Sequence, residues 1–168
     1  MASLGLATST SAASLEARLD EGTGTITIHR DGLAKPLVTQ HAAADHRPYL
    51  HPIVGPDGNG VLTEYISRHH KNQTGMYWDL TRVNGRDYFH HPADNYWGRK
   101  GVKVLEARGE SVKWETVYDL LDADGNAVLT ETNRSDGFAV LRVFRPDETY
   151  EPVVRDFIDR VECASTPL

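Results

Sequence analysis

The chain has 168 residues, of which 39% are hydrophobic and 25% charged, a composition typical of a soluble globular protein with one domain. Its 18 basic and 24 acidic residues give a formal net charge of −6, which argues against nucleic acid as a partner because phosphate binding needs a basic surface. The sequence has no apolar run of the ~20 residues that a membrane-spanning helix needs. A single cysteine, Cys163, excludes an internal disulfide and a CxxC metal site.

Residues 1–20 are rich in Ser, Ala and Thr. They lack the basic start and the apolar run of a secretory signal. We therefore expect a flexible lead-in over residues 1–20 and a cytoplasmic protein. The remaining residues, 21–168, are expected to form a single domain, complete or truncated.

From residue 23 onward, short runs of Val, Ile, Thr, Tyr and Trp alternate with Gly, Asp, Asn and Pro, which is typical of strands and turns. The predicted strands cover residues 23–29, 36–40, 49–54, 61–66, 76–83, 86–90, 102–108, 112–121, 127–132 and 138–144. Residues 150–162 change to a helical spacing of apolar side chains. The sequence thus predicts an all-β fold: an antiparallel β-sandwich built from hairpins, with a short C-terminal helix at residues 150–162.

The strongest hairpin signal is Asn84-Gly85, because both positions of a two-residue type I′ turn need a positive φ. The register of this hairpin would place Asp79 opposite His90, with their Cβ atoms about 5 Å apart. Either Asp79 orients His90 as an acid/base group or metal ligand, or the two form an ordinary cross-strand ion pair. The same alternation predicts a core face and a polar face: Met76, Trp78, Leu80 and Phe89 on the first, and Tyr77, Asp79, Thr81, Tyr88 and His90 on the second.

Histidine is the unusual component of the composition, because seven of the eight histidines lie between residues 41 and 91. Most fall at predicted strand ends or in loops, where sites are commonly built. The candidate acid/base groups are His51, His69, His70 and His90, with Asp79 as the orienting acid. His51, His69 and His90 are also candidate ligands for a divalent metal such as zinc or iron. A polar pocket without metal and scattered structural histidines are the alternatives.

Polar and aromatic side chains accompany these histidines, a mixture that suits a sugar-like, hydroxyl-rich ligand. The candidate substrate-binding residues are Arg47, Tyr49, Glu64, Tyr77, Arg82 and Tyr88. The sequence contains no GxGxxG, no P-loop and no G-x-S-x-G motif, so it gives no sign of a dinucleotide, nucleotide or serine-hydrolase site. Trp114, Tyr118 and Leu120 alternate along a predicted strand and are expected in the core.

Three blocks of the sequence resemble a bacterial family labelled PmoA-like, or methane oxygenase PmoA. The blocks are HRPYLHPIVGPDGNGVLTEY from His46, HHKNQTGMYWDLTRVNGRDYFHHP from His69 and WETVYDLLDADGNAVLTET from Trp114. The resemblance implies a soluble β-rich protein that looks like carbohydrate-handling sandwiches. Read literally, the label would mean a metal-dependent oxygenase, which we keep as an outside hypothesis.

Two departures from that family pattern affect the expected function. This chain has Lys71-Asn72 after the histidine pair, where the relatives carry a further histidine, and the relatives continue beyond residue 132 with more strands. The resemblance therefore implies a truncated member. Three hypotheses remain open: an enzyme acting on a carbohydrate or similar polar metabolite, a non-catalytic ligand-binding sandwich, and a degenerate relative without a complete site. An exposed edge strand would also favour a homodimer.

Overall fold

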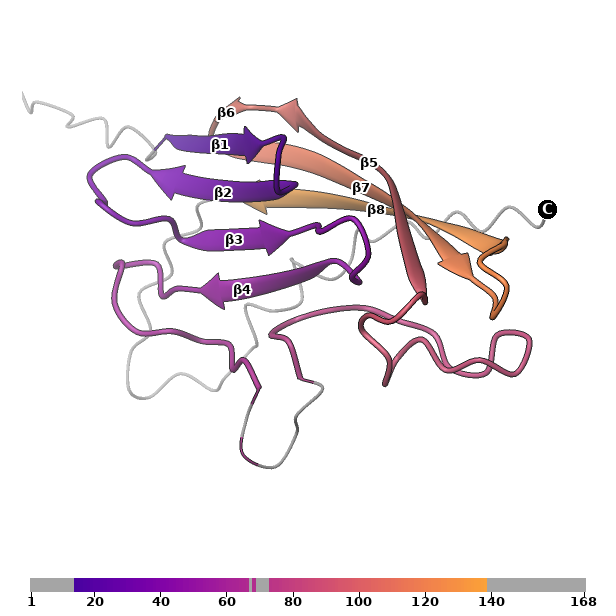
Figure 1. Cartoon of the computed structure of the whole chain (residues 1–168). Coiled ribbons are helices and arrows are strands. Elements are labelled where there is room, and N and C mark those ends of the chain that lie inside the picture. Colours follow the sequence, from indigo (N-terminus) through magenta and orange to yellow (C-terminus); the bar gives the residue numbers. More distant parts are fainter. Residues whose placement is uncertain (1–13, 67, 69–72, 139–168) are drawn as a thin grey trace, which may run out of the picture.

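The computed structural model describes residues 14–66, 68 and 73–138. Within these ranges the strands form two sheets (Figure 1): a five-stranded sheet in the order β4-β3-β2-β1-β6 and a three-stranded sheet in the order β5-β7-β8. Every strand pairing is antiparallel, and the described residues contain no helix. The prediction of an all-β antiparallel protein is therefore confirmed.

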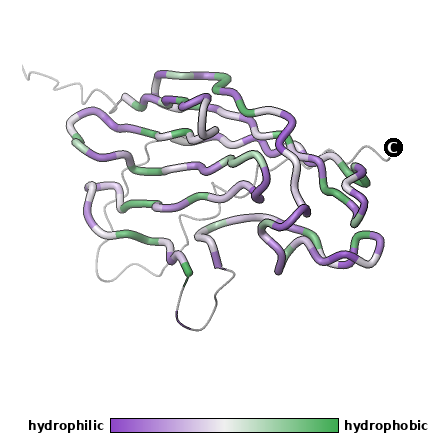
Figure 2. Tube along the Cα trace, in the orientation of Figure 1, coloured by the Kyte–Doolittle hydropathy of each residue, from purple (hydrophilic) through white to green (hydrophobic). Residues whose placement is uncertain are grey.

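The five-stranded sheet consists of short strands: β1 (Leu15–Asp20), β2 (Thr25–Arg30), β3 (Val38–His41), β4 (Tyr49–Ile53) and β6 (Arg108–Gly109). Those of the other sheet are longer, and they are β5 (Trp97–Glu106), β7 (Ser111–Leu121) and β8 (Ala127–Phe138). Green and purple stretches alternate along these strands in Figure 2, as expected for strands with one face turned to the core.

Three parts of the predicted strand pattern are wrong. Residues 1–20, expected to be a flexible lead-in, contain β1. Its apolar residues Leu15 and Ala17 alternate with charged ones, so they are buried on one face of the strand. Strand β8 continues from Ala127 to Phe138, across the gap between the predicted strands 127–132 and 138–144, because cross-strand pairing with β7 holds these residues extended. Residues 61–66, 76–83 and 86–90 form only isolated bridges. The predicted helix at 150–162 and the strand after residue 138 lie outside the described residues.

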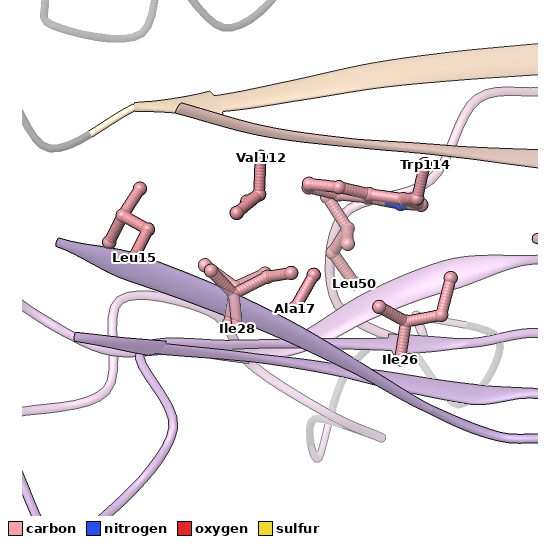
Figure 3. Packing of buried hydrophobic residues seen from close by; sticks show 8 residues of the cluster. Leu15, Ala17, Ile26, Ile28, Leu50, Val112 and Trp114 are labelled. Carbon is pink, nitrogen blue, oxygen red and sulfur yellow. The ribbon is translucent and has the colours of Figure 1, made fainter. Parts of the chain in front are cut away.

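Side chains from both sheets meet in one hydrophobic cluster (Figure 3). The five-stranded sheet contributes the apolar positions of β1 to β4, such as Ile26 and Leu50, and β7 contributes Val112 and Trp114. The Trp114 indole Nε1 donates a hydrogen bond to Gln40 Oε1 on β3 at 3.3 Å, so the buried ring is also tied to the opposite sheet through its polar atom.

A second cluster lies at the other end of the three-stranded sheet. It contains Ala42, Tyr88, Trp97, Tyr118 and Leu120. The two buried tyrosines donate hydrogen bonds to backbone carbonyls, Tyr88 to Leu121 at 2.8 Å and Tyr118 to Ala43 at 2.6 Å, which satisfies their hydroxyl groups. The predicted core positions Trp114, Tyr118 and Leu120 are thus confirmed. In the ranges that the structure covers, no helix is long and apolar enough to cross a membrane.

Candidate functional site

A row of histidine and tyrosine rings lies across β3, β4 and the loop that follows β4. In the β3–β4 pairing His41 is opposite Tyr49. Leu50 belongs to the core cluster. Because side chains alternate along a strand, Tyr49 and His51 fall on the face of β4 away from that core. The ring row consists of His41, His46, Tyr49, His51 and Tyr65.

The rings of this row form a continuous series of contacts. The His41 and Tyr49 rings stack with centroids 4.6 Å apart, Tyr49 and Tyr65 are 5.8 Å apart, and Tyr65 and His51 are 5.3 Å apart. The His46 ring meets Tyr49 edge-on at 5.4 Å. Tyr65 is 44% exposed and the other four rings are half-buried, so the row is a surface feature.

Hydrogen bonds fix the orientation of the imidazoles. His41 Nε2 is 2.8 Å from the His51 carbonyl oxygen, and His46 Nδ1 is 2.9 Å from the Arg47 carbonyl oxygen. Because a carbonyl only accepts, these nitrogens carry the protons, and in the neutral ring the other nitrogen is an acceptor. Burial and the nearby His41 lower the pKa of His51, whereas burial and the Tyr65 hydrogen bond raise the pKa of Tyr49 to about 12. At neutral pH His51 and Tyr49 are therefore uncharged.

Arg47 lies two residues before β4 and is fully buried. Its Nε and Nη2 donate to Thr74 Oγ1 at 3.4 and 3.1 Å, and its Nη1 donates to the Phe89 carbonyl. The guanidinium carbon lies 3.3 Å from the centroid of the Tyr77 ring, a cation–π contact. Arg47 thus fastens three separate stretches of chain to one another, which is a structural role rather than the substrate contact predicted from the sequence.

Asp79 is the acidic neighbour of Arg47. Its side chain is fully buried, with Oδ2 3.9 Å from Arg47 Nη1, a distance too long for a hydrogen bond. Asp79 Oδ1 accepts the Leu80 backbone N–H at 2.6 Å. Burial is the main cause that raises the pKa of Asp79 to about 7, and the attraction of Arg47 only partly opposes it.

The predicted pairing of Asp79 with His90 is wrong. The Asn84-Gly85 turn forms, with positive φ at both residues and a 2.9 Å hydrogen bond from Arg86 N to Val83 O. Beyond the turn, however, the N–H groups of both Tyr88 and Phe89 donate to the Leu80 carbonyl, which is a bulge that shifts the register. His90 Nδ1 instead lies 2.7 Å from Asp87 Oδ2.

The bulge also changes which side chains enter the core. Tyr88, expected on the polar face, is fully buried, whereas Trp78 and Phe89, expected in the core, are 55% and 37% exposed. Met76 and Leu80 do pack against the core clusters, as predicted.

The remaining candidate residues do not form one site. Glu64 and Arg82 are exposed, and Arg82 has a positive φ of 61°. His69 and His70 lie outside the described residues, and with them one of the three candidate metal ligands. Among the residues that the structure describes, no group of three or more His, Cys, Asp or Glu side chains is arranged to hold a metal ion. Of the predicted set, Tyr49 and His51 meet in the ring row, and Arg47, Tyr77 and Asp79 meet in the interior.

Sequence reasoning missed His41, His46 and Tyr65 as members of the ring row. Strand β3 shows no alternation of buried and exposed positions, because Val38, Thr39 and Gln40 are all buried, so the sequence pattern did not mark His41 as the partner of Tyr49. No local pattern could have found Tyr65, because its place depends on the path of a loop.

Comparison with known proteins gives one family match. The model of a family of unknown function, DUF6807, matches residues 25–138, a segment that runs from β2 to β8. No curated protein and no solved structure matches the chain.

The matching family corrects the resemblance drawn from the sequence blocks. That resemblance pointed to a PmoA-like family, but the family found has no assigned function and its description carries no oxygenase label. The oxygenase and carbohydrate activities that the resemblance implied therefore have no support from it. Because the match covers more than half of the chain, the protein belongs to the DUF6807 family.

Proposed function

We propose that this protein binds a hydroxyl-rich small molecule, such as a sugar, at the ring row. The observation that supports the proposal is the unbroken contact of five histidine and tyrosine rings on the face of β3 and β4 away from the core. Such a concentration of half-exposed rings is unusual on a merely solvated surface, where charged side chains are the common occupants.

The chemistry of the ring row favours hydrogen bonding to hydroxyl groups. Each imidazole of the ring row uses one nitrogen in a hydrogen bond within the protein, and the Tyr49 and Tyr65 hydroxyls bond to each other. The second imidazole nitrogens and the remaining bonding capacity of the hydroxyls are left for a ligand. A tyrosine hydroxyl both donates and accepts, whereas His41 and His46 offer an acceptor nitrogen, because their donors bond to backbone carbonyls. A sugar hydroxyl needs that same combination, and its C–H groups pack well against rings.

The geometry favours binding over catalysis. Asp79 lies in the interior beside Arg47, and His90 pairs with Asp87, so Asp79 does not orient His90 as the sequence suggested. Catalysis by His51, His69 and His70 stays a prediction, as does a divalent metal.

We also propose that the two sheets form the layers of a β-sandwich, which the shared hydrophobic cluster supports. Cytoplasmic residence remains a prediction of the sequence.

Titration with neutral saccharides tests the proposed function. We expect glucose, galactose, xylose or cellobiose to shift the backbone amide NMR signals of β3 and β4. Tyr65→Phe, which removes one hydroxyl group and keeps the ring, should weaken binding about fivefold, the effect of one hydrogen bond worth about 1 kcal/mol. His51→Ala should weaken it by at least as much.

Trp78→Ala is the matched control, because Trp78 is an exposed aromatic residue outside the ring row. It should leave saccharide affinity unchanged. The proposal is wrong if no saccharide perturbs β3 and β4 at millimolar concentration, or if Trp78→Ala weakens binding as much as the ring-row variants do.

A further inference from the structure

The free hydrogen-bonding capacity of the ring row consists mainly of acceptors. His41 Nε2 donates to the His51 carbonyl and His46 Nδ1 donates to the Arg47 carbonyl. In the neutral rings, His41 Nδ1 and His46 Nε2 therefore carry lone pairs. In the described part of the chain neither atom has a hydrogen-bond partner, and neither is among the buried polar atoms that lack one. Both lone pairs are therefore open to a ligand.

The other polar groups of the ring row do not reverse this balance. The Tyr49 and Tyr65 hydroxyls bond to each other, so whichever of them donates, the pair keeps one free O–H group and further lone pairs. His51 Nδ1 lies 2.9 Å from the Thr63 hydroxyl, which can donate or accept. Apart from His51, the row thus offers two fixed imidazole acceptors and the spare lone pairs of the phenols, against one phenol donor.

The charge around the ring row favours a cationic group over an anionic one. The chain has a formal net charge of −6. Among the described residues, the two cation–π contacts lie outside the row, because Arg47 covers Tyr77 and Arg86 covers Tyr96. Tyr65 is 44% exposed, which leaves part of its ring open to a cation–π contact with a ligand. A ligand ammonium would find acceptors and an aromatic face there, whereas a carboxylate would face lone pairs.

We propose that the ring row prefers an amino sugar, whose protonated amine donates hydrogen bonds to the free imidazole nitrogens of His41 and His46. Both imidazoles contact the Tyr49 ring, with centroids 4.6 and 5.4 Å away, so their free nitrogens belong to one patch. The inference rests on the proposed binding of hydroxyl-rich molecules and adds the chemical class of the ligand.

The physical reason for this preference is the match between donors and acceptors. An ammonium has three donors and no acceptor, so it complements a set of acceptors better than a hydroxyl group does. A hydrogen bond from a charged donor is also stronger than one between two neutral groups. The hydroxyl groups and the C–H face of the sugar keep the contacts that the proposed function assigns to them.

Binding of three sugars to the wild-type chain tests the proposal. Glucosamine and glucuronate each differ from glucose at one carbon, and all three are titrated at pH 7 in 0.15 M NaCl, where salt screens the attraction of the net charge beyond ~8 Å. Backbone amide NMR signals of β3 and β4 report the site. We expect glucosamine to bind about fivefold more tightly than glucose, because a charge-assisted hydrogen bond replaces a neutral one, and glucuronate to bind most weakly.

Replacement of each imidazole by a phenyl ring locates the effect. His46→Phe keeps a ring beside Tyr49 and removes the acceptor, so the preference for glucosamine over glucose should fall to about twofold or less. His41→Phe should act in the same way. His91→Phe is the matched control, because His91 stacks on Tyr96 at 4.7 Å outside the ring row. It should keep the wild-type preference.

The outcomes separate this proposal from the proposed function. If glucose shifts the signals of β3 and β4 but glucosamine binds no more tightly, or if glucuronate binds most tightly, the choice of an amino sugar is wrong while saccharide binding stands. If none of the three sugars perturbs β3 and β4 at millimolar concentration, the proposed function fails and the amino-sugar proposal fails with it. A preference for glucosamine that both His41→Phe and His46→Phe retain would also overturn the proposal, because the imidazole nitrogens would then not be the acceptors.

Discussion

Arg47 illustrates how a single residue can connect distant parts of this chain. Its side chain is completely buried and bonds to Thr74 and to the Phe89 carbonyl while it covers the Tyr77 ring. The charge on Arg47 is delocalised and its planar group offers several donors, which lysine cannot reproduce. A charge in this position is maintained only because its donors are used and Asp79 lies nearby.

We expect Arg47→Ala to lower the free energy of unfolding by about 3 kcal/mol or more, because it breaks a buried pair and removes the bonds to Thr74 and Phe89. Urea unfolding measures this effect. Arg18→Ala is the control, since its side chain is 59% exposed and pairs with Glu16 at the surface; its unfolding midpoint should equal that of wild type. Equal midpoints for Arg47→Ala and wild type would contradict the fastening role of Arg47.

At the scale of elements, the Asn84-Gly85 turn shows what a local signal can and cannot predict. The turn itself forms as expected, with Gly85 at φ 83°, because its conformation depends only on these two residues. The strands on either side do not form a regular ladder, because burying Tyr88 against the second core cluster requires the bulge at residues 88 and 89. Tertiary packing therefore overrides the register that the turn alone would set.

A comparison of two glycines with open surroundings separates the conformational cost of adding a side chain from its packing cost. A Cβ added at Gly85 or at Gly101 meets no atom within 4 Å, but only Gly85 has a positive φ. Gly85→Ala should therefore destabilise the protein by about 1 kcal/mol, whereas Gly101→Ala should be neutral or slightly stabilising. Thermal unfolding of both variants checks this expectation, which a loss of stability in Gly101→Ala alone would contradict.

For the whole molecule, stability depends on the hydrophobic cluster that both sheets share. Trp114 is 1% exposed within it, whereas Trp78 is 55% exposed. Trp114→Ala should cost about 3–5 kcal/mol, as large-to-small changes of buried aromatic residues do, and Trp78→Ala should change the unfolding midpoint little. Denaturant unfolding of the two variants compares them directly. A larger loss for Trp78→Ala would show that the two sheets do not pack through Trp114.

The sequence by itself determined the all-β class, the approximate positions of β2, β3, β4 and β7, and the burial of Trp114, Tyr118 and Leu120. These features depend on period-two alternation and on turn residues, which are local properties of the chain. Only the tertiary structure decided that β1 joins the five-stranded sheet and that Asp79 lies beside Arg47 rather than His90. It also decided that the rings of His41, Tyr49, Tyr65 and His51 come together. These contacts join residues far apart in the chain, and their formation depends on how much surface the whole fold buries.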